Sequence, residues 1–162
     1  MTDTDFMRQA LALADQAAAL GEVPVGCVIV RGGEIVGQGF NRRESGRSAL
    51  AHAELIAIDQ ACRTLGGWRL WQCTLYVTLE PCPMCAGAII SARIPRVVFA
   101  ASDPKAGSCG SLTNLFSLPY NHRPAVESGL LADEAAGQLR AFFRRLRAPK
   151  ACPAGLPDYL PD

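Results

Sequence analysis

Two short motifs, thirty residues apart, place the strongest limit on how this chain can fold. AHAELIAI (51–58) carries His52 and Glu54, and PCPMC (81–85) carries Cys82 and Cys85. The chain has only two histidines, and this one lies two residues from a glutamate inside an otherwise apolar run. If one ion binds these side chains, the fold must bring the two motifs together.

The Cys-x-x-Cys spacing allows two thiolates to bind one metal ion. Cys82 and Cys85 lie at the predicted start of a helix, where the positive end of the helix dipole lowers the pKa of a thiol. With the imidazole of His52 they make three ligands, and the sequence shows no obvious fourth. Zinc takes four tetrahedral ligands, and three protein ligands with one water position are typical of catalytic zinc. We therefore expect one Zn²⁺ on His52, Cys82 and Cys85.

Glu54 is the candidate catalytic residue of this pattern. A carboxylate that enters the pocket beside the metal can take a proton from the attacking water and deliver it to the substrate. The full pattern, H-x-E followed by P-C-x-x-C, is the signature of zinc deaminases that act on nucleobases. Two other hypotheses stay open: a closed structural zinc site, or ordinary helix residues beside buried cysteines.

Hydrophobic periodicity and turn residues predict an α/β domain with a mixed sheet. A first helix is expected to begin at a cap formed by Asp3 or Thr4 and to end at Gly21. The other expected helices cover 51–65, 83–92 and 133–147, and the expected strands cover 23–30, 35–40, 74–79 and 96–100. The two glycines of 32–33 predict a hairpin turn with positive φ between the first two strands. Residues 102–124 are expected to form a loop.

Composition indicates one folded domain in a reducing compartment. The 162 residues are 49% hydrophobic and 19% charged, which suits a single core. Acidic and polar first residues, with no apolar run approaching ~18 residues, predict a cytoplasmic protein without a membrane span. We expect a single domain over 1–150 and a mobile, Pro-rich tail over 151–162. The net charge of +1 neither requires nor excludes nucleic acid, but residues 140–150 hold five basic side chains and no acidic one.

Beyond the two motifs, the chain resembles the bacterial tRNA-specific (wobble) adenosine deaminases of the zinc-dependent cytidine/deoxycytidylate deaminase superfamily. The resemblance runs from about residue 6 to about residue 147. The matching stretches are EVPVGCVIV (22–30), GFN (39–41), AHAE (51–54), TLYVTLEPCPMCAGAII (74–90), RIPRVVFAASDPKAG (93–107), GSL (110–112), NHR (121–123), LADE (131–134) and AFFRRLR (141–147). Residues 48–51 depart from the family's frequent D-P-T-A, so the loop before the zinc helix is expected to differ in shape.

The resemblance implies a fold, a chemistry and a set of site residues. The fold would be a three-layer α/β/α cytidine-deaminase-like fold with a five-stranded mixed sheet, in a homodimer whose tRNA site draws on both chains. His52, Cys82 and Cys85 would hold zinc, and Glu54 would move protons as the wobble adenosine of a tRNA anticodon arm becomes inosine. The residues expected to contact the substrate are Val23, Pro24, Val25, Asn41, Ala53, Asp103, Lys105, Phe143 and Arg144.

Two alternative functions remain beside this one. A deaminase of free bases or nucleosides, of guanine or cytosine type, would use the same scaffold. A non-catalytic RNA-binding subunit with structural zinc would have no need of Glu54. From the residues alone, Asn41 is equally well a turn-capping residue, and Asp103 before a proline is a common turn starter. The target base must leave its loop to reach the metal, which costs little in an unpaired anticodon.

Overall fold

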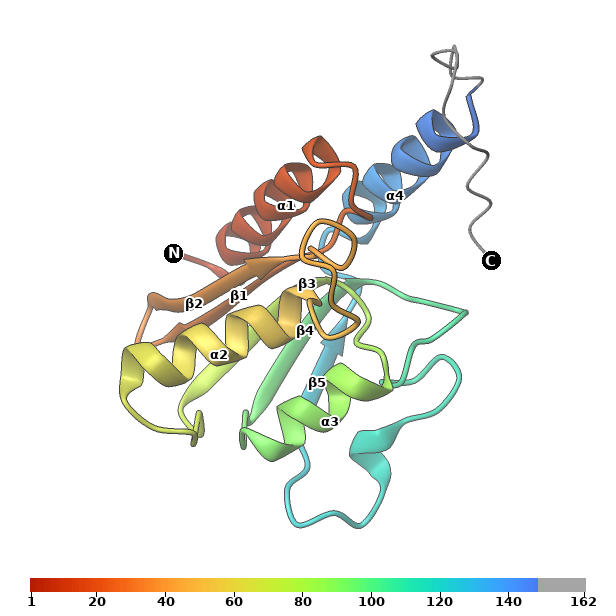
Figure 1. Ribbon diagram of the computed structural model, residues 1–162. Coiled ribbons are helices and arrows are strands. Elements are labelled where there is room, and N and C mark those ends of the chain that lie inside the picture. The colour runs from red at the N-terminus through yellow and green to blue at the C-terminus, as the bar shows by residue number, and fades with distance from the viewer. Residues whose placement is uncertain (149–162) are drawn as a thin grey trace.

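A computed structural model describes residues 1–148, which form one mixed sheet with helices on both faces (Figure 1). The helices are α1 (Asp3–Ala19), α2 (Ala53–Leu65), α3 (Pro83–Ser91), the 3-10 helix η1 (Leu115–Ser117) and α4 (Ala132–Arg147). The strands are β1 (Gly26–Arg31), β2 (Glu34–Phe40), β3 (Cys73–Leu79), β4 (Arg96–Ala101) and β5 (Ala125–Ser128). The expected three-layer α/β/α architecture with a five-stranded mixed sheet is confirmed. The tail predicted over 151–162 lies outside the described residues.

Strand direction decides where the connecting loops gather. The strand order is β2-β1-β3-β4-β5. Strand β1 pairs antiparallel with β2 and β3, whereas β3, β4 and β5 pair in parallel. Every strand except β1 therefore runs in the same direction, and four carboxyl ends meet at one end of the sheet. Helices α2 and α3 begin at this carboxyl end, which is where ligands bind in sheets of this kind.

Two apolar layers hold the helices against the sheet, because successive strand side chains point to opposite faces. The side chains that pack under α2 and α3 include Cys27, Ile29, Leu75, Val77, Val97 and Phe99. The side chains that pack under α1 and α4 include Val28, Val30, Tyr76, Val98 and Ala100. Both layers form from the same strands, so the sheet is buried on both faces.

A glycine in β2 sets how closely the start of α2 approaches the sheet. A Cβ atom added at Gly39 would lie 2.7 Å from the carbonyl oxygen of Ala53 and 2.8 Å from the Cβ of Ile56. Any side chain larger than hydrogen would push the first turn of α2 outward. The sequence G-F-N thus places the helix that follows His52 directly on β2.

The predicted element boundaries are correct within a few residues, with three corrections. The cap of α1 is Thr2, whose side chain forms a capping box with Asp5, rather than Asp3 or Thr4. Strand β1 begins at Gly26, so residues 23–25 are a lead-in to the strand and not part of it. Strand β5 (Ala125–Ser128) is not among the expected strands, and it follows directly after the segment expected to be a loop. The hairpin turn is as predicted, with φ of 58° at Gly32 and 81° at Gly33.

The opposite end of the sheet carries the turns between elements. The β1–β2 hairpin turn and the α2–β3 connection lie there, and the connection exposes Trp68 and Trp71. The side chain of Trp68 stacks with the guanidinium groups of Arg69 and Arg93. Within residues 1–148, each helix is either too short or too polar to cross a lipid bilayer.

Candidate metal centre

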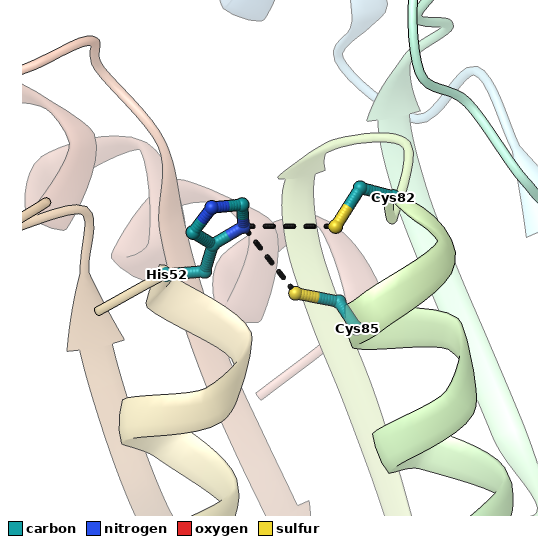
Figure 2. Close-up of side chains that lie close together, drawn as sticks. All are labelled: His52, Cys82 and Cys85. Carbon is teal, nitrogen blue, oxygen red and sulfur yellow. Dashed lines mark hydrogen bonds between the residues drawn. The ribbon is translucent and has the colours of Figure 1, made fainter. Parts of the chain in front are cut away.

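The three predicted metal ligands meet at the carboxyl end of the sheet (Figure 2). His52 is the N-cap of α2 and Cys82 is the N-cap of α3, and neither side chain makes a capping hydrogen bond. Their side chains are turned toward each other instead, and Cys85 joins them from the first turn of α3. Each helix therefore begins at a ligand, with the positive end of its dipole directed at the sulfurs.

The distances within this group suit a tetrahedral metal ion. The Nδ1 atom of His52 lies 3.7 Å from the sulfur of Cys82 and 3.5 Å from the sulfur of Cys85. Zinc–sulfur and zinc–nitrogen bonds at the tetrahedral angle would place a sulfur and a nitrogen ligand about 3.6 Å apart. One nitrogen and two sulfurs are also the ligand types that zinc prefers, so the residues present fit the ion.

The two thiols have opposite acidities although they lie side by side. Hydrogen bonds from Cys85 and His52 lower the pKa of Cys82 to about 4. The hydrogen bond to Cys82, burial and the charge of Glu54 raise the pKa of Cys85. The hydrogen bond between His52 and Cys82 also raises the pKa of His52. These shifts show that the three side chains share protons within one cluster. A divalent cation that binds both sulfurs would displace these protons.

Glu54 lies beside the metal ligands in the first turn of α2. It is buried, and this burial raises the pKa of its carboxyl above the ordinary value. Its neighbours are the Cys85 thiol, its own backbone amide and the charges of Cys82 and His52. A buried carboxyl with a raised pKa next to a metal centre has the properties of a group that exchanges protons.

The first loop, residues 41–52, brings Asn41 and the lead-in to β1 to the same end of the sheet. The side-chain amide of Asn41 donates to the carbonyl of Val23 at 3.1 Å, and its side-chain oxygen accepts from the amide of Arg43 at 3.1 Å. These two hydrogen bonds are turn-capping contacts, and they also fix the lead-in against the loop; a contact between Asn41 and the substrate stays a prediction. Ser48, in the stretch that departs from the family pattern, accepts from the amide of Leu50 and makes a local turn before His52.

Two buried glutamates that sequence reasoning did not select hold the loops around this centre. The carboxylate of Glu22 accepts from the amides of Glu44 and Ser45, in the first loop, at 2.9 and 3.2 Å. The carboxylate of Glu80 accepts from amides of the second loop, residues 102–114. Burial opposes ionisation of Glu80, but these hydrogen bonds outweigh it and the pKa lies below its ordinary value. The only sequence signal is an acidic residue beside an apolar strand.

The remaining predicted contact residues lie at different distances from the metal ligands. Asp103 and Lys105 are in the second loop at the carboxyl end, where the Asp103 carboxylate accepts from the Lys105 amide at 2.9 Å. Phe143 and Arg144 lie on α4, which covers the other face of the sheet from α2 and α3 (Figure 1). Phe143 is 39% exposed and stacks edge-on against the buried Phe142. The structure does not bring this pair to the metal ligands.

Comparisons with known proteins agree with this arrangement. Residues 1–101 match the family model of the cytidine and deoxycytidylate deaminase zinc-binding region. A tRNA-specific adenosine deaminase of Bacillus subtilis (strain 168) is 50% identical over 149 residues, which cover 91% of this chain and 92% of that protein.

Solved structures give the same relationship. A structure from work on A-to-I editing by tRNA:A34 deaminases at the wobble position of transfer RNA has a TM-score of 0.82 and 45% identity, covering 84% of this chain and 99% of that one. A guanine deaminase structure from Bacillus subtilis has a TM-score of 0.62 and 33% identity, covering 93% of this chain and 98% of that one.

Proposed function

The chain belongs to the zinc-binding cytidine and deoxycytidylate deaminase family, and from this we infer that it is a zinc-dependent adenosine deaminase of tRNA. The reaction is the hydrolytic conversion of adenosine to inosine at the wobble position, with release of ammonia. The similarity to tRNA-specific adenosine deaminases over most of both chains supports this substrate class. Each chain takes one zinc ion.

The observation that carries the proposal is the group formed by His52, Cys82, Cys85 and the buried Glu54. Within residues 1–148, the first three are the group of His, Cys, Asp and Glu side chains close enough together to hold an ion. Three ligands leave a position for water, which a closed structural site would not. The placement of Glu54 beside them argues against a purely structural zinc and for a proton-transfer role.

We propose that Glu54 transfers the protons of the reaction and that the residues around it hold the base. A zinc ion held by the three ligands would supply Lewis acidity, which would make water nucleophilic near neutral pH. Glu54 accepts a proton from the attacking water and passes it to the adenine ring nitrogen next to C6. Glu54 then assists the departure of the amino group as ammonia. Ala53 and the lead-in residues Val23, Pro24 and Val25 provide the apolar surface on which the base rests, and Asn41 contacts the nucleoside.

The anticodon arm is the part of tRNA that we propose as the substrate region, in contact with Asp103 and Lys105 at one end. The basic and aromatic face of α4, with Phe143 and Arg144, would contact the arm away from the reacting base. We also propose a homodimer, since the segment around η1 packs beside α3 and exposes Leu112, Leu118 and Tyr120. A cytoplasmic location is supported by the six cysteines of residues 1–148, which are all free thiols.

The alternative supported by a specific observation is a deaminase of free bases, because guanine deaminases share the fold at lower identity. Incubation of the protein with an anticodon stem-loop, followed by sequencing, distinguishes the two. We expect the wobble adenosine to be read as G, and a stem-loop with guanosine at that position to release no ammonia. Efficient ammonia release from free guanine or cytosine, with an unchanged stem-loop, would overturn the proposal.

A further inference from the structure

Glu80 lies at the end of β3, and its carboxylate is surrounded by the second loop. One carboxylate oxygen accepts from the amide of Asp103 at 3.1 Å and from the hydroxyl of Ser111. The other oxygen accepts from the amides of Cys109 at 3.0 Å and Ser111 at 3.1 Å. Four donors spread over nine residues thus converge on one side chain, which is 2% exposed. A buried carboxylate with this many donors is stable in its charged form.

The backbone of the second loop packs closely against this carboxylate at Gly107. A Cβ atom added at Gly107 would collide with the carboxylate of Glu80 and with the carbonyl oxygen of Asp103. The amide of Gly107 donates to that same carbonyl at 2.9 Å, which closes a tight turn. Gly107 is therefore needed for close approach, and its backbone lies directly on the Glu80 side chain.

The inner side of this loop borders the metal centre. The amide of Ser108 donates to the carbonyl of Pro81 at 2.9 Å, one residue before Cys82. The next residue, Cys109, is buried, and burial together with the charges of Glu80, Glu54 and Cys82 raises the pKa of its thiol to about 12. Residues 107–109 are therefore buried and bonded to the residue that precedes Cys82, while residues 110–113 are exposed.

We propose that Glu80 is a positioning residue, which holds the second loop in place so that residues 107–109 form a fixed wall of the substrate pocket. The inference rests on the proposed function for the identity of the substrate, an adenine base. Glu80 does not touch the reacting atoms. It acts through backbone amides, and the peptide Glu80–Pro81–Cys82 links the same side chain to the first sulfur of the metal centre.

The first test compares Glu80→Gln with the wild type well below the melting temperature. The amide of glutamine replaces one acceptor with a donor, so two of the loop's donors lose their partner. We expect one zinc per chain, exchange of the Cys109 and Ser111 amides at least about tenfold faster, and unchanged exchange in the first turn of α2. We expect kcat on an anticodon stem-loop to fall roughly tenfold to a hundredfold, with a smaller change in KM.

A second variant moves the loop while leaving the carboxylate intact. Gly107→Ala should produce the same pattern, namely faster loop exchange and lower kcat with zinc retained. Gly87→Ala is the matched control, since a Cβ at this position of α3 meets no atom within 4 Å. It should leave kcat and loop exchange at wild-type values.

The outcomes separate this proposal from the proposed function. Unchanged exchange of the Cys109 and Ser111 amides in both variants, or kcat within twofold of wild type despite faster exchange, would overturn it. Loss of zinc from Glu80→Gln would also overturn it, because Glu80 would then act on the metal ligands. If the wild-type protein makes no inosine, the proposed function fails, while amide exchange still decides whether Glu80 holds the loop.

Discussion

Three glutamates are buried at the carboxyl end of the sheet, and they differ in what surrounds them. Glu22, Glu80 and Glu54 are 1%, 2% and 4% exposed, so burial does not distinguish them. Glu22 and Glu80 accept hydrogen bonds from backbone amides of the first and second loops. Glu54 has the Cys85 thiol and its own amide as neighbours, and burial raises its pKa.

This difference separates two groups of residues. We call Glu22 and Glu80, with the loops they hold, the frame, and Glu54 with the metal ligands the reactive centre. A buried carboxylate with several amide donors stays charged and fixes the backbone that supplies them. A buried carboxylate with few donors is costly to keep charged, and a raised pKa suits such a group for proton exchange. The same residue type therefore serves both purposes within one end of the sheet. Partners, and not burial, decide which purpose a glutamate serves.

The largest effect we expect comes from removal of zinc, which tests whether centre and frame are independent. Dialysis against a chelator should abolish inosine formation, and added zinc should restore it, because the three ligands lose the ion they share. Hydrogen exchange should show loosened first turns of α2 and α3. The amides of Ser45 and Cys109, which bond to Glu22 and Glu80, should keep their protection. Loss of protection at these amides as well would mean that the frame depends on the metal.

The next largest effect is expected for Glu54→Ala, which removes the reactive carboxylate. Inosine formation should fall by about 10²- to 10⁴-fold or more, as expected for a group that transfers protons. Zinc content of Glu54→Ala should stay at one per chain. In the isosteric variant Glu54→Gln, the free energy of unfolding should change by less than about 1 kcal/mol, because no loop depends on this carboxylate. Activity measured by sequencing, with zinc content as control, decides the point. Unchanged activity would remove Glu54 from the mechanism.

Glu22→Gln should give the complementary result, in which stability changes more than chemistry. We expect a loss of about 1–3 kcal/mol in the free energy of unfolding, because the amides of Glu44 and Ser45 lose part of the buried acceptor on Glu22. Glu44→Gln is the matched control, because Glu44 takes part through its backbone amide and its side chain is dispensable. Denaturant titration of both variants measures the difference. Equal losses would show that the acceptor on Glu22 is unimportant.

The smallest effect comes from a carboxylate outside this region. Asp3 pairs with Arg96 at 2.7 Å and with Tyr76, which lower its pKa from 3.8 to about 2. Because the folded-state pKa is the lower one, the stabilisation is present above pH 4 and disappears as the pH falls toward 2. Asp3 is 44% exposed, so Asp3→Asn should cost at most about 1 kcal/mol at neutral pH.

Thermal unfolding of wild type and Asp3→Asn between pH 2 and pH 7 measures the stabilisation that the Asp3 carboxylate contributes. The two curves should differ at neutral pH and converge near pH 2, with no effect on inosine formation. Asp59→Asn, in a pair with Arg63 on α2, provides the comparison for a more exposed ion pair and should change stability less. A stability difference between wild type and Asp3→Asn that grows as the pH falls would contradict a lowered pKa for Asp3.

The metal ligands could be predicted from the sequence because side chains carry the signal. The spacing of Cys82 and Cys85, and the strand–helix context around them, were enough to identify the ligands that the structure brings together. The roles of Glu22 and Glu80 could not be found in this way. Their partners are backbone amides, which every residue has, so only the folded path of the chain reveals that four donors converge on Glu80.

The errors in the predicted element bounds also have physical causes. Residues 23–25 resemble a strand by their β-branched side chains, but Pro24 has no amide proton to give to a neighbouring strand. Strand β5 has four residues and largely exposed side chains, so it shows no apolar run that would identify it. Near the start of α1, residues 2–4 are all good caps, and the position of Asp5 selects Thr2 through the capping box.

The placement of the tryptophans determines what optical measurements can see. Both indoles of the chain, Trp68 and Trp71, lie in the α2–β3 connection, at the far end of the sheet from the metal ligands. Intrinsic tryptophan fluorescence will therefore report denaturation near that connection and will not change when nucleic acid binds at the metal centre. A fluorophore intended to monitor docking has to be introduced elsewhere, for example by an indole at an exposed position of the second loop.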